Sequence, residues 1–151
     1  MKQRIAVLLM LGLMPWSELR AQAQQADTSF KVSARVEAGC AMSASYALHG
    51  TTLLRATCTP NSGYQIGLNE GTSPGATVNQ RKMVSGANAL NYQLYSDSSR
   101  STIWGNTTGT DTVTGVGTGL AQDHTVFGAI PAAQVVPAGD YADTITVRIY
   151  Y

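Results

Sequence analysis

A strictly alternating segment near the N-terminus places the strongest constraint on the fold of this chain. Its apolar residues occupy every second position of the stretch 30–36: Phe30, Val32, Ala34 and Val36. A period of two is typical of a β-strand with one buried and one exposed face. The stretch Asp143–Tyr151 alternates in the same way. We therefore expect an amphipathic strand at each end, pairing either within this chain or with another one.

Residues 1–23 resemble a secretion signal. Lys2 and Arg4 precede an apolar run, Ile5–Met14, that is too short to span a bilayer. The stretch 21–23 then supplies a small-x-small cleavage pattern. A membrane anchor is the alternative, but the chain becomes polar after Pro15. We expect cleavage after Ala23 and export of the remainder.

Charge excludes some classes of partner. Removal of residues 1–23 leaves seven of the ten basic and eight of the nine acidic residues, a formal net charge of −1. A nucleic-acid or anionic-membrane partner would require a clustered basic face, which the sequence does not have. We therefore expect no nucleic-acid partner. The length after cleavage suits one domain with one core.

The chain has two cysteines, Cys40 and Cys58. In an oxidising compartment such a pair favours one disulfide, closing a loop of about 18 residues and contributing roughly 3 kcal/mol. A metal site is the alternative, but neither His49 nor His124 has ligand spacing to a cysteine. We expect the disulfide, no metal and no cofactor.

The rest of the sequence indicates short strands separated by turns. Predicted strands cover 51–58, 64–69, 78–84, 90–95 and 125–130, with a weak one near 112–113. Turn signals lie at 60–63, 85–88 and 137–140. This spacing predicts an all-β, immunoglobulin-like antiparallel β-sandwich.

Several of these segments together resemble the spore coat protein U domain family, which includes the Csu-type pilins of the archaic chaperone–usher pathway. The matching pieces are the alternating segment before Cys40, Leu90-Asn91-Tyr92-x-Leu94-Tyr95-x-Asp97, Ile103-Trp104-Gly105, Val126-Phe127-Gly128-x-Ile130-Pro131 and Pro137-Ala138-Gly139-x-Tyr141-x-Asp143-Thr144. The resemblance covers essentially the whole chain after residue 23. It implies a signal peptide at 1–23, a donor-strand segment at 24–37 and a pilin β-sandwich domain at 38–151.

The resemblance also implies a mechanism of assembly. Such pilins have an incomplete sandwich, whose open groove is filled first by a strand of a periplasmic chaperone. At the outer-membrane usher, the N-terminal segment of the next subunit replaces it. In this chain the donor residues would be Phe30, Val32, Ala34 and Val36. Burial of the three larger ones contributes roughly 5–9 kcal/mol before ordering costs.

The acceptor groove would be lined by the C-terminal strand through Ile145, Val147 and Ile149. The carboxylate of Tyr151 would be held by basic residues of the chaperone. The implied product is a surface filament of homo- or heteropolymeric pilins that serves attachment and biofilm formation. An ordinary first strand that pairs within its own chain is the alternative reading of the donor segment.

Signals of an enzyme are weak. The sequence has no phosphate-binding loop or zinc-protease motif. We interpret Asp140 as a turn residue, Asp143 as a residue at a strand entrance, and His124 beside Asp123 as a solvated histidine. Two non-enzymatic alternatives to a pilus subunit remain: a secreted spore-coat or matrix protein, and a single-domain carbohydrate-binding adhesin. The adhesin would use Trp104 and the loop 105–119, although Trp104 fits a core position better.

Overall fold

The computed structural model describes residues 25–36 and 48–151. Within these ranges every regular element is a β-strand and all strand pairings are antiparallel, which confirms the predicted all-β fold. The predicted signal sequence and Cys40 lie outside the described residues. No helix in the described part of the chain is long and apolar enough to cross a bilayer. The strands are β1 (Gln25–Val36), β2 (Leu48–Thr57), β3 (Gly63–Leu68), β4 (Arg81–Ser85), β5 (Asn88–Tyr95), β6 (Val113–Val116), β7 (Ala121–Ile130) and β8 (Gly139–Tyr150).

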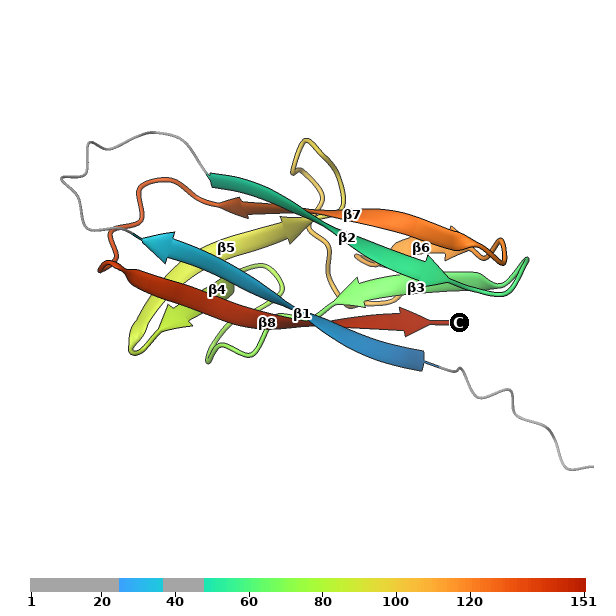
Figure 1. Ribbon diagram of the computed structural model, residues 1–151, viewed down its shortest axis with the longest axis horizontal. Helices are drawn as coiled ribbons and strands as arrows, with labels where there is room; N and C mark the ends of the chain where they lie inside the picture. Colours follow the sequence, from blue (N-terminus) through green and yellow to red (C-terminus); the bar gives the residue numbers. More distant parts are fainter. Residues whose placement is uncertain (1–24, 37–47) are drawn as a thin grey trace, which may run out of the picture.

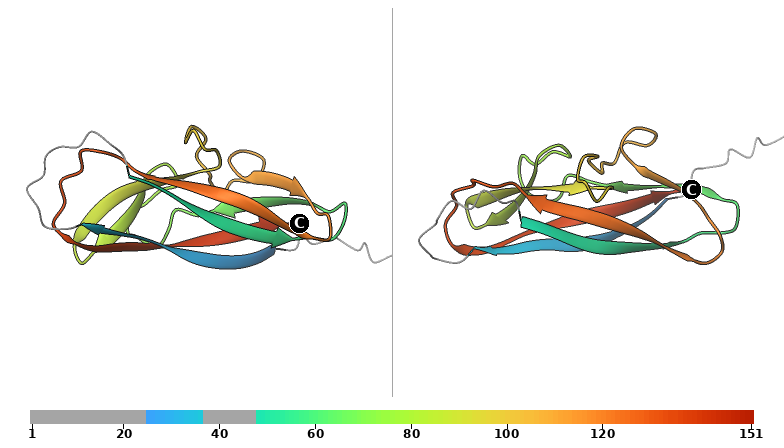
Figure 2. Two further views of the ribbon diagram at one scale, coloured as in Figure 1. Left: turned by 45° about the horizontal axis from the view of Figure 1, so that its top comes forward. Right: turned by 90° about the horizontal axis from the view of Figure 1, so that it is seen from above.

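The strands form two facing layers that are joined through β5 (Figures 1 and 2). Hydrogen bonding runs in the order β2-β7-β5-β4-β8-β3-β6, and β1 pairs with β8 outside this path. The first half of β5 pairs with β4, and its last three residues pair with β7. One layer therefore holds β2 and β7, and the other holds β1, β8, β4, β3 and β6. In Figure 1 the β2–β7 pair lies above the β1–β8 pair.

The turns follow their local chemistry. β4 and β5 form a hairpin whose first loop residue, Gly86, has a φ of 59°, a conformation that costs glycine little. The turn before β3 contains Asn61 with a φ of 62°, and asparagine tolerates this region better than most residues. Both turns are predicted by their residue types. The first brings β5 back against β4, and the second leads the chain from β2 in one layer to β3 in the other.

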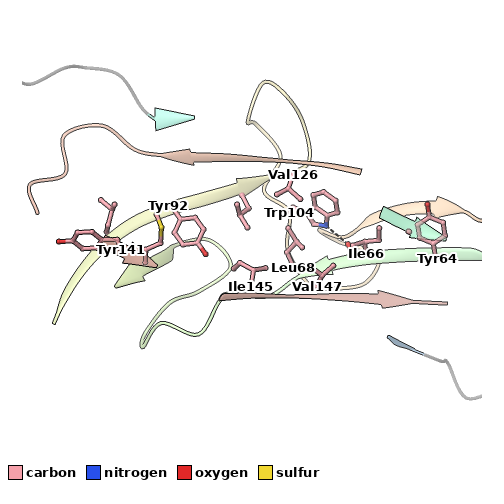
Figure 3. Close-up of a cluster of buried hydrophobic side chains, with 13 residues drawn as sticks. Tyr64, Ile66, Leu68, Tyr92, Trp104, Val126, Tyr141, Ile145 and Val147 are labelled. Carbon is pink, nitrogen blue, oxygen red and sulfur yellow. Dashed lines mark hydrogen bonds between the residues drawn. The ribbon is translucent and has the colours of Figure 1, made fainter. Parts of the chain in front are cut away.

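The core lies between the layers and takes side chains from most strands (Figure 3). Leu68, Met83 and Ile145 are fully buried, and Trp104 enters the core from the loop after β5. The indole Nε1 of Trp104 donates a hydrogen bond to the carbonyl of Ile66 at 2.8 Å. Trp104 is therefore a core residue, as its position in the sequence favoured, and it is not available for stacking on a sugar.

Strand boundaries differ from the sequence prediction at several ends. β2 begins at Leu48 rather than at residue 51, and β4 begins at Arg81 because residues 77–80 form a tight turn. β8 begins at Gly139, inside the stretch expected to be a turn, and it ends at Tyr150. The early start of β8 has a tertiary cause, since its first residue pairs with the last residue of β1.

Candidate functional site

The C-terminal strand β8 has two different edges. Along one edge it pairs with β4 at Ala142 and with β3 from Val147 to Tyr150. Along the other edge it pairs with β1 over the full length of both strands, from Gln25 opposite Tyr150 to Val36 opposite Gly139. Without β1, this second edge would leave a row of backbone donors and acceptors unpaired, which is unfavourable for a long strand. The β1–β8 pairing is therefore the candidate functional site.

The side chains of β1 alternate as predicted. Phe30, Val32 and Ala34 are half-buried and pack against the core, whereas Lys31, Ser33 and Arg35 are exposed. Their inward row faces the inward row of β8: Phe30 lies opposite Ile145, and Ala34 lies opposite Tyr141. The structure thus pairs the predicted donor segment with β8 of the same chain. Pairing within the chain is the alternative reading that the sequence left open.

The predicted acceptor residues occupy different environments. Ile145 is fully buried and Val147 is 6% exposed, so both belong to the core. Ile149 is half-buried at the end of β8. Tyr151 follows the last residue of β8 and is half exposed. The first three share the inward face of β8, whereas Tyr151 lies beyond the strand.

A groove remains open between β1 and β2. Two adjoining hollows of about 290 and 280 Å³ lie there, and both are lined by Val32, Ser33, Gly50, Leu94 and Gly128. A third hollow of about 210 Å³ lies between Leu54 of β2 and Val147 of β8. Among the described strands, β2 pairs only with β7 and β1 only with β8. These two strands therefore face each other across the groove without a hydrogen-bonded ladder between them.

A buried carboxylate anchors β8 to the loop before β4. Asp143 accepts hydrogen bonds from the hydroxyl of Tyr92 at 2.7 Å and from the backbone amide and hydroxyl of Thr72 at 2.8 and 3.0 Å. Burial, together with the hydrogen bond to Asp143, raises the pKa of Tyr92 far above its usual value. Asp143 was expected at a strand entrance, which is wrong, because it lies inside β8 and is 3% exposed.

Arg81 is a second buried polar group, and no sequence pattern indicated it. Its guanidinium is fully buried and donates hydrogen bonds to five oxygens. Nη2 reaches the carbonyls of Leu68 at 2.9 Å and Trp104 at 2.8 Å, and Nη1 reaches Oε1 of Gln93 at 2.7 Å. The carbonyls of residues 69 and 78 complete the set. Burial lowers the pKa of Arg81 to about 10, so it stays charged at neutral pH.

The remaining candidates have structural environments. His124 Nε2 lies 2.8 Å from the hydroxyl of Tyr64, so the histidine bridges β7 and β3 rather than being solvated as expected. Burial lowers the pKa of His124. Asp123 forms an exposed ion pair with Arg55 at 2.7 Å. The described residues contain no group of three or more His, Cys, Asp or Glu side chains that could hold a metal ion. The disulfide stays a prediction, because Cys40 lies outside the described ranges.

Residues 26–148 match the Spore Coat Protein U domain. This range starts inside β1 and ends inside β8, so it includes most of the pairing of the two terminal strands. The chain belongs to the Spore Coat Protein U domain family. Proteins of this family are structural rather than enzymatic, which agrees with the expectation that the chain is not an enzyme.

Known relatives agree with this assignment. The chain is 38% identical to "Protein U" of Myxococcus xanthus over an alignment of 110 residues, which covers 69% of this chain and 61% of that protein. The chain therefore spans less than two thirds of the length of this curated relative.

Two solved structures have similar folds. The first is a chain of the CsuC–CsuE chaperone–tip adhesion subunit pre-assembly complex from archaic chaperone–usher Csu pili of Acinetobacter baumannii. The TM-score is 0.53 at 25% identity, covering 83% of this chain and 40% of that one. The second is a Burkholderia pseudomallei antigen and type I fimbria protein, with a TM-score of 0.51 at 16% identity, covering 86% of this chain and all of that one. The Spore Coat Protein U domain described here is therefore pilin-like in fold.

Proposed function

We propose that this protein is a structural pilus subunit that polymerises by donor-strand exchange into a surface filament for attachment and biofilm formation. One observation carries the proposal: among the described strands, β1 is hydrogen bonded to β8 alone, along the edge of β8 that faces away from β3 and β4. An element attached along one edge can be exchanged for the same element of a second copy with no change in contacts, which makes exchange energetically inexpensive.

The apolar surface that β1 covers also supports this proposal. Residues Phe30, Val32 and Ala34 cover part of the core that β8 and β5 would otherwise expose, including Ile145 and Leu94. A subunit without β1 has an apolar edge that requires another strand, and this need favours a dedicated chaperone in the periplasm. In the proposed pathway the chaperone strand covers the edge first, and β1 of the next subunit replaces it at the outer-membrane usher.

The domain organisation follows from the same proposal. Residues 1–23 direct export, 24–37 form the donor segment, and 38–151 form the acceptor sandwich with Ile145, Val147 and Ile149 in its groove. Val36 is the fourth donor residue, and Tyr151 contributes its carboxylate to chaperone binding. The disulfide between Cys40 and Cys58 would join the start of the sandwich to the end of β2.

A deletion and a matched pair of substitutions test the proposal. A chain lacking residues 24–36 should co-purify with its chaperone but form no SDS-resistant ladder. Phe30→Asp places a charge on the inward face of β1 and should abolish the ladder as well, whereas Lys31→Asp, on the outward face, should preserve it. Chaperone co-purification controls for folding in each case. Normal ladder formation by the deletion variant would refute donor-strand exchange.

The relative in Myxococcus xanthus and the family name favour a second candidate, a secreted coat or matrix protein. This candidate predicts deposition on the cell surface in a strain that has no chaperone or usher. Failure of deposition in that strain would exclude it and leave the pilus subunit.

A further inference from the structure

The outward faces of β1 and β8 carry complementary charges at both ends of their pairing. Asp27 lies opposite Arg148 at one end, and Arg35 lies opposite Asp140 at the other. The Asp27–Arg148 pair is bidentate, with Nε to Oδ1 at 2.9 Å and Nη2 to Oδ2 at 3.0 Å. Between the ends, the facing residues of β8 are uncharged: Thr146, Thr144 and Ala142.

On the other edge of β8, strand β3 offers Arg148 no side chain from the directly opposite position. There the residue opposite Arg148 is Gly67, which has no side chain. The carboxylate that pairs with Arg148 across the strands thus comes from whichever strand occupies the edge of β8 where β1 lies. The hydrogen bonds of the pair lower the pKa of Asp27 and raise that of Arg148, as expected for two groups that stabilise each other's charge.

The apolar pattern alone does not fix how β1 lies on β8. A slip by two residues keeps every inward side chain inward, because side chains alternate with a period of two. Such a slip places Gln25 or Ser29 opposite Arg148 and puts residue 138 or 142 opposite Arg35, so both opposite-charge pairs are lost. If β1 instead lay parallel to β8 on the same edge, with residue 30 opposite residue 143, its apolar side chains would also still point inward.

The charges distinguish these arrangements. In that parallel alignment Asp27 would lie opposite Asp140, and Arg35 would lie opposite Arg148, so like charges would meet at both ends. Opposite charges facing each other across strands stabilise a pairing and like charges destabilise it. Of the arrangements compared, the antiparallel register of the structure alone places opposite charges together at both ends.

We infer that Asp27, Arg35, Asp140 and Arg148 form a charge code that selects the direction and register of the strand bound to β8. The occupant it recognises is β1, with an acidic residue near its start and a basic residue eight positions later. The extension of the code to β1 of a second copy rests on the proposed function. The four residues therefore determine specificity, whereas the apolar row supplies the buried surface.

Charge reversal in the full-length protein tests the code. Asp27→Arg and Arg148→Asp each place like charges opposite one another, and each variant alone should assemble about two- to fivefold less efficiently into SDS-resistant ladders at low salt. The double variant restores opposite charges and should recover the wild-type yield. In 1 M salt, where screening acts within about 3 Å, the differences should disappear. Lys31→Glu reverses a charge on the same face opposite uncharged Thr144 and should have no effect.

Mixing the two single variants separates the code from strand exchange. When β1 of the Asp27→Arg chain pairs with β8 of the Arg148→Asp chain, the two substituted positions carry opposite charges. The reciprocal pairing brings together the unchanged Asp27 and Arg148, which are also opposite in charge. Differently tagged chains should therefore form ladders in which the two variants alternate.

The possible outcomes distinguish the code from the proposed function. Absence of ladders from the wild type and from every variant would refute exchange between copies. The code would then be measured within one chain, as a loss of stability to urea in each single variant that the double variant recovers. Recovery of ladders by the double variant without recovery by the mixture would contradict the code between copies, because both place opposite charges together. Wild-type assembly by both single variants at low salt, or failure of the double variant to recover, would overturn the charge code itself.

Discussion

Replacement of Arg81 by Met should destabilise the fold more than any other change of a single charged residue in β4. Arg81→Met keeps an unbranched side chain but removes all five hydrogen-bond donors of the guanidinium. The acceptors on Leu68, Trp104 and Gln93 are buried with the arginine and would lose these partners. Leaving a buried acceptor unsatisfied costs about 1–3 kcal/mol, and these costs are not additive.

The net magnitude is smaller than the sum because the arginine itself is costly to bury. A charged guanidinium loses its hydration in the core, and the apolar replacement removes that penalty. We expect a net loss of about 3–5 kcal/mol, which corresponds to two or three unsatisfied buried acceptors at about 1–3 kcal/mol each, less the hydration penalty that methionine avoids. This loss is a large share of the roughly 5–15 kcal/mol that stabilises a typical domain.

Urea unfolding followed by the fluorescence of Trp104 measures this loss. Trp104 is the single tryptophan once residues 1–23 are removed, and its carbonyl is one of the acceptors of Arg81. The midpoint for Arg81→Met should fall by about 2 M urea with an unchanged slope. Lys82→Met removes the same charge from the neighbouring, half-buried residue and should shift stability by no more than about 0.5 kcal/mol. Equal midpoints for the two variants would refute the structural role assigned to Arg81.

Three further predictions concern other parts of the fold. Because burial lowers the pKa of His124, the unfolded chain binds its proton more readily, so stability should fall as the pH drops below about 6.5; His124→Gln should flatten this dependence in unfolding experiments at pH 7.5 and 5.5. Tyr92→Phe removes the hydroxyl that donates to the buried carboxylate of β8, and should cost about 1.5–3 kcal/mol by the same urea assay; no change would contradict the contact. A Cβ on Gly117 would overlap the carbonyl oxygen of Thr59, so Gly117→Ala should lower the melting temperature, whereas Gly63→Ala, with open space around it, should be close to neutral.

The sequence predicted those features of the fold that depend on neighbouring residues in the chain. Alternation in residues 30–36 predicted both a strand and its inward face, because a period of two is a local property of extended backbone. Turn residues predicted the hairpin at Gly86 in the same way. Composition and the short spacing between turn signals predicted an all-β chain. The resemblance to the Spore Coat Protein U domain was carried by several short motifs in order, and the comparison over residues 26–148 confirmed it.

The buried polar residues were not predictable from the sequence. Arg81 and Asp143 lie in alternating segments that resemble ordinary half-exposed strands, and a charged residue is usually exposed. Their burial depends on oxygens and donors brought together from distant residues, such as Leu68 and Trp104 around Arg81 and Tyr92 beside Asp143. No local pattern encodes such a convergence.

The sequence by itself determined that the chain forms amphipathic strands at both ends and which face of each is apolar, because side-chain alternation follows directly from backbone geometry. The tertiary structure decided which edge β1 occupies, in which register, and that Asp27 and Asp140 lie opposite Arg148 and Arg35. This information exists only when two segments far apart in the chain lie side by side. Strand pairing is a long-range choice among alignments that preserve the same faces, and only the opposing residues of the partner strand distinguish one alignment from another.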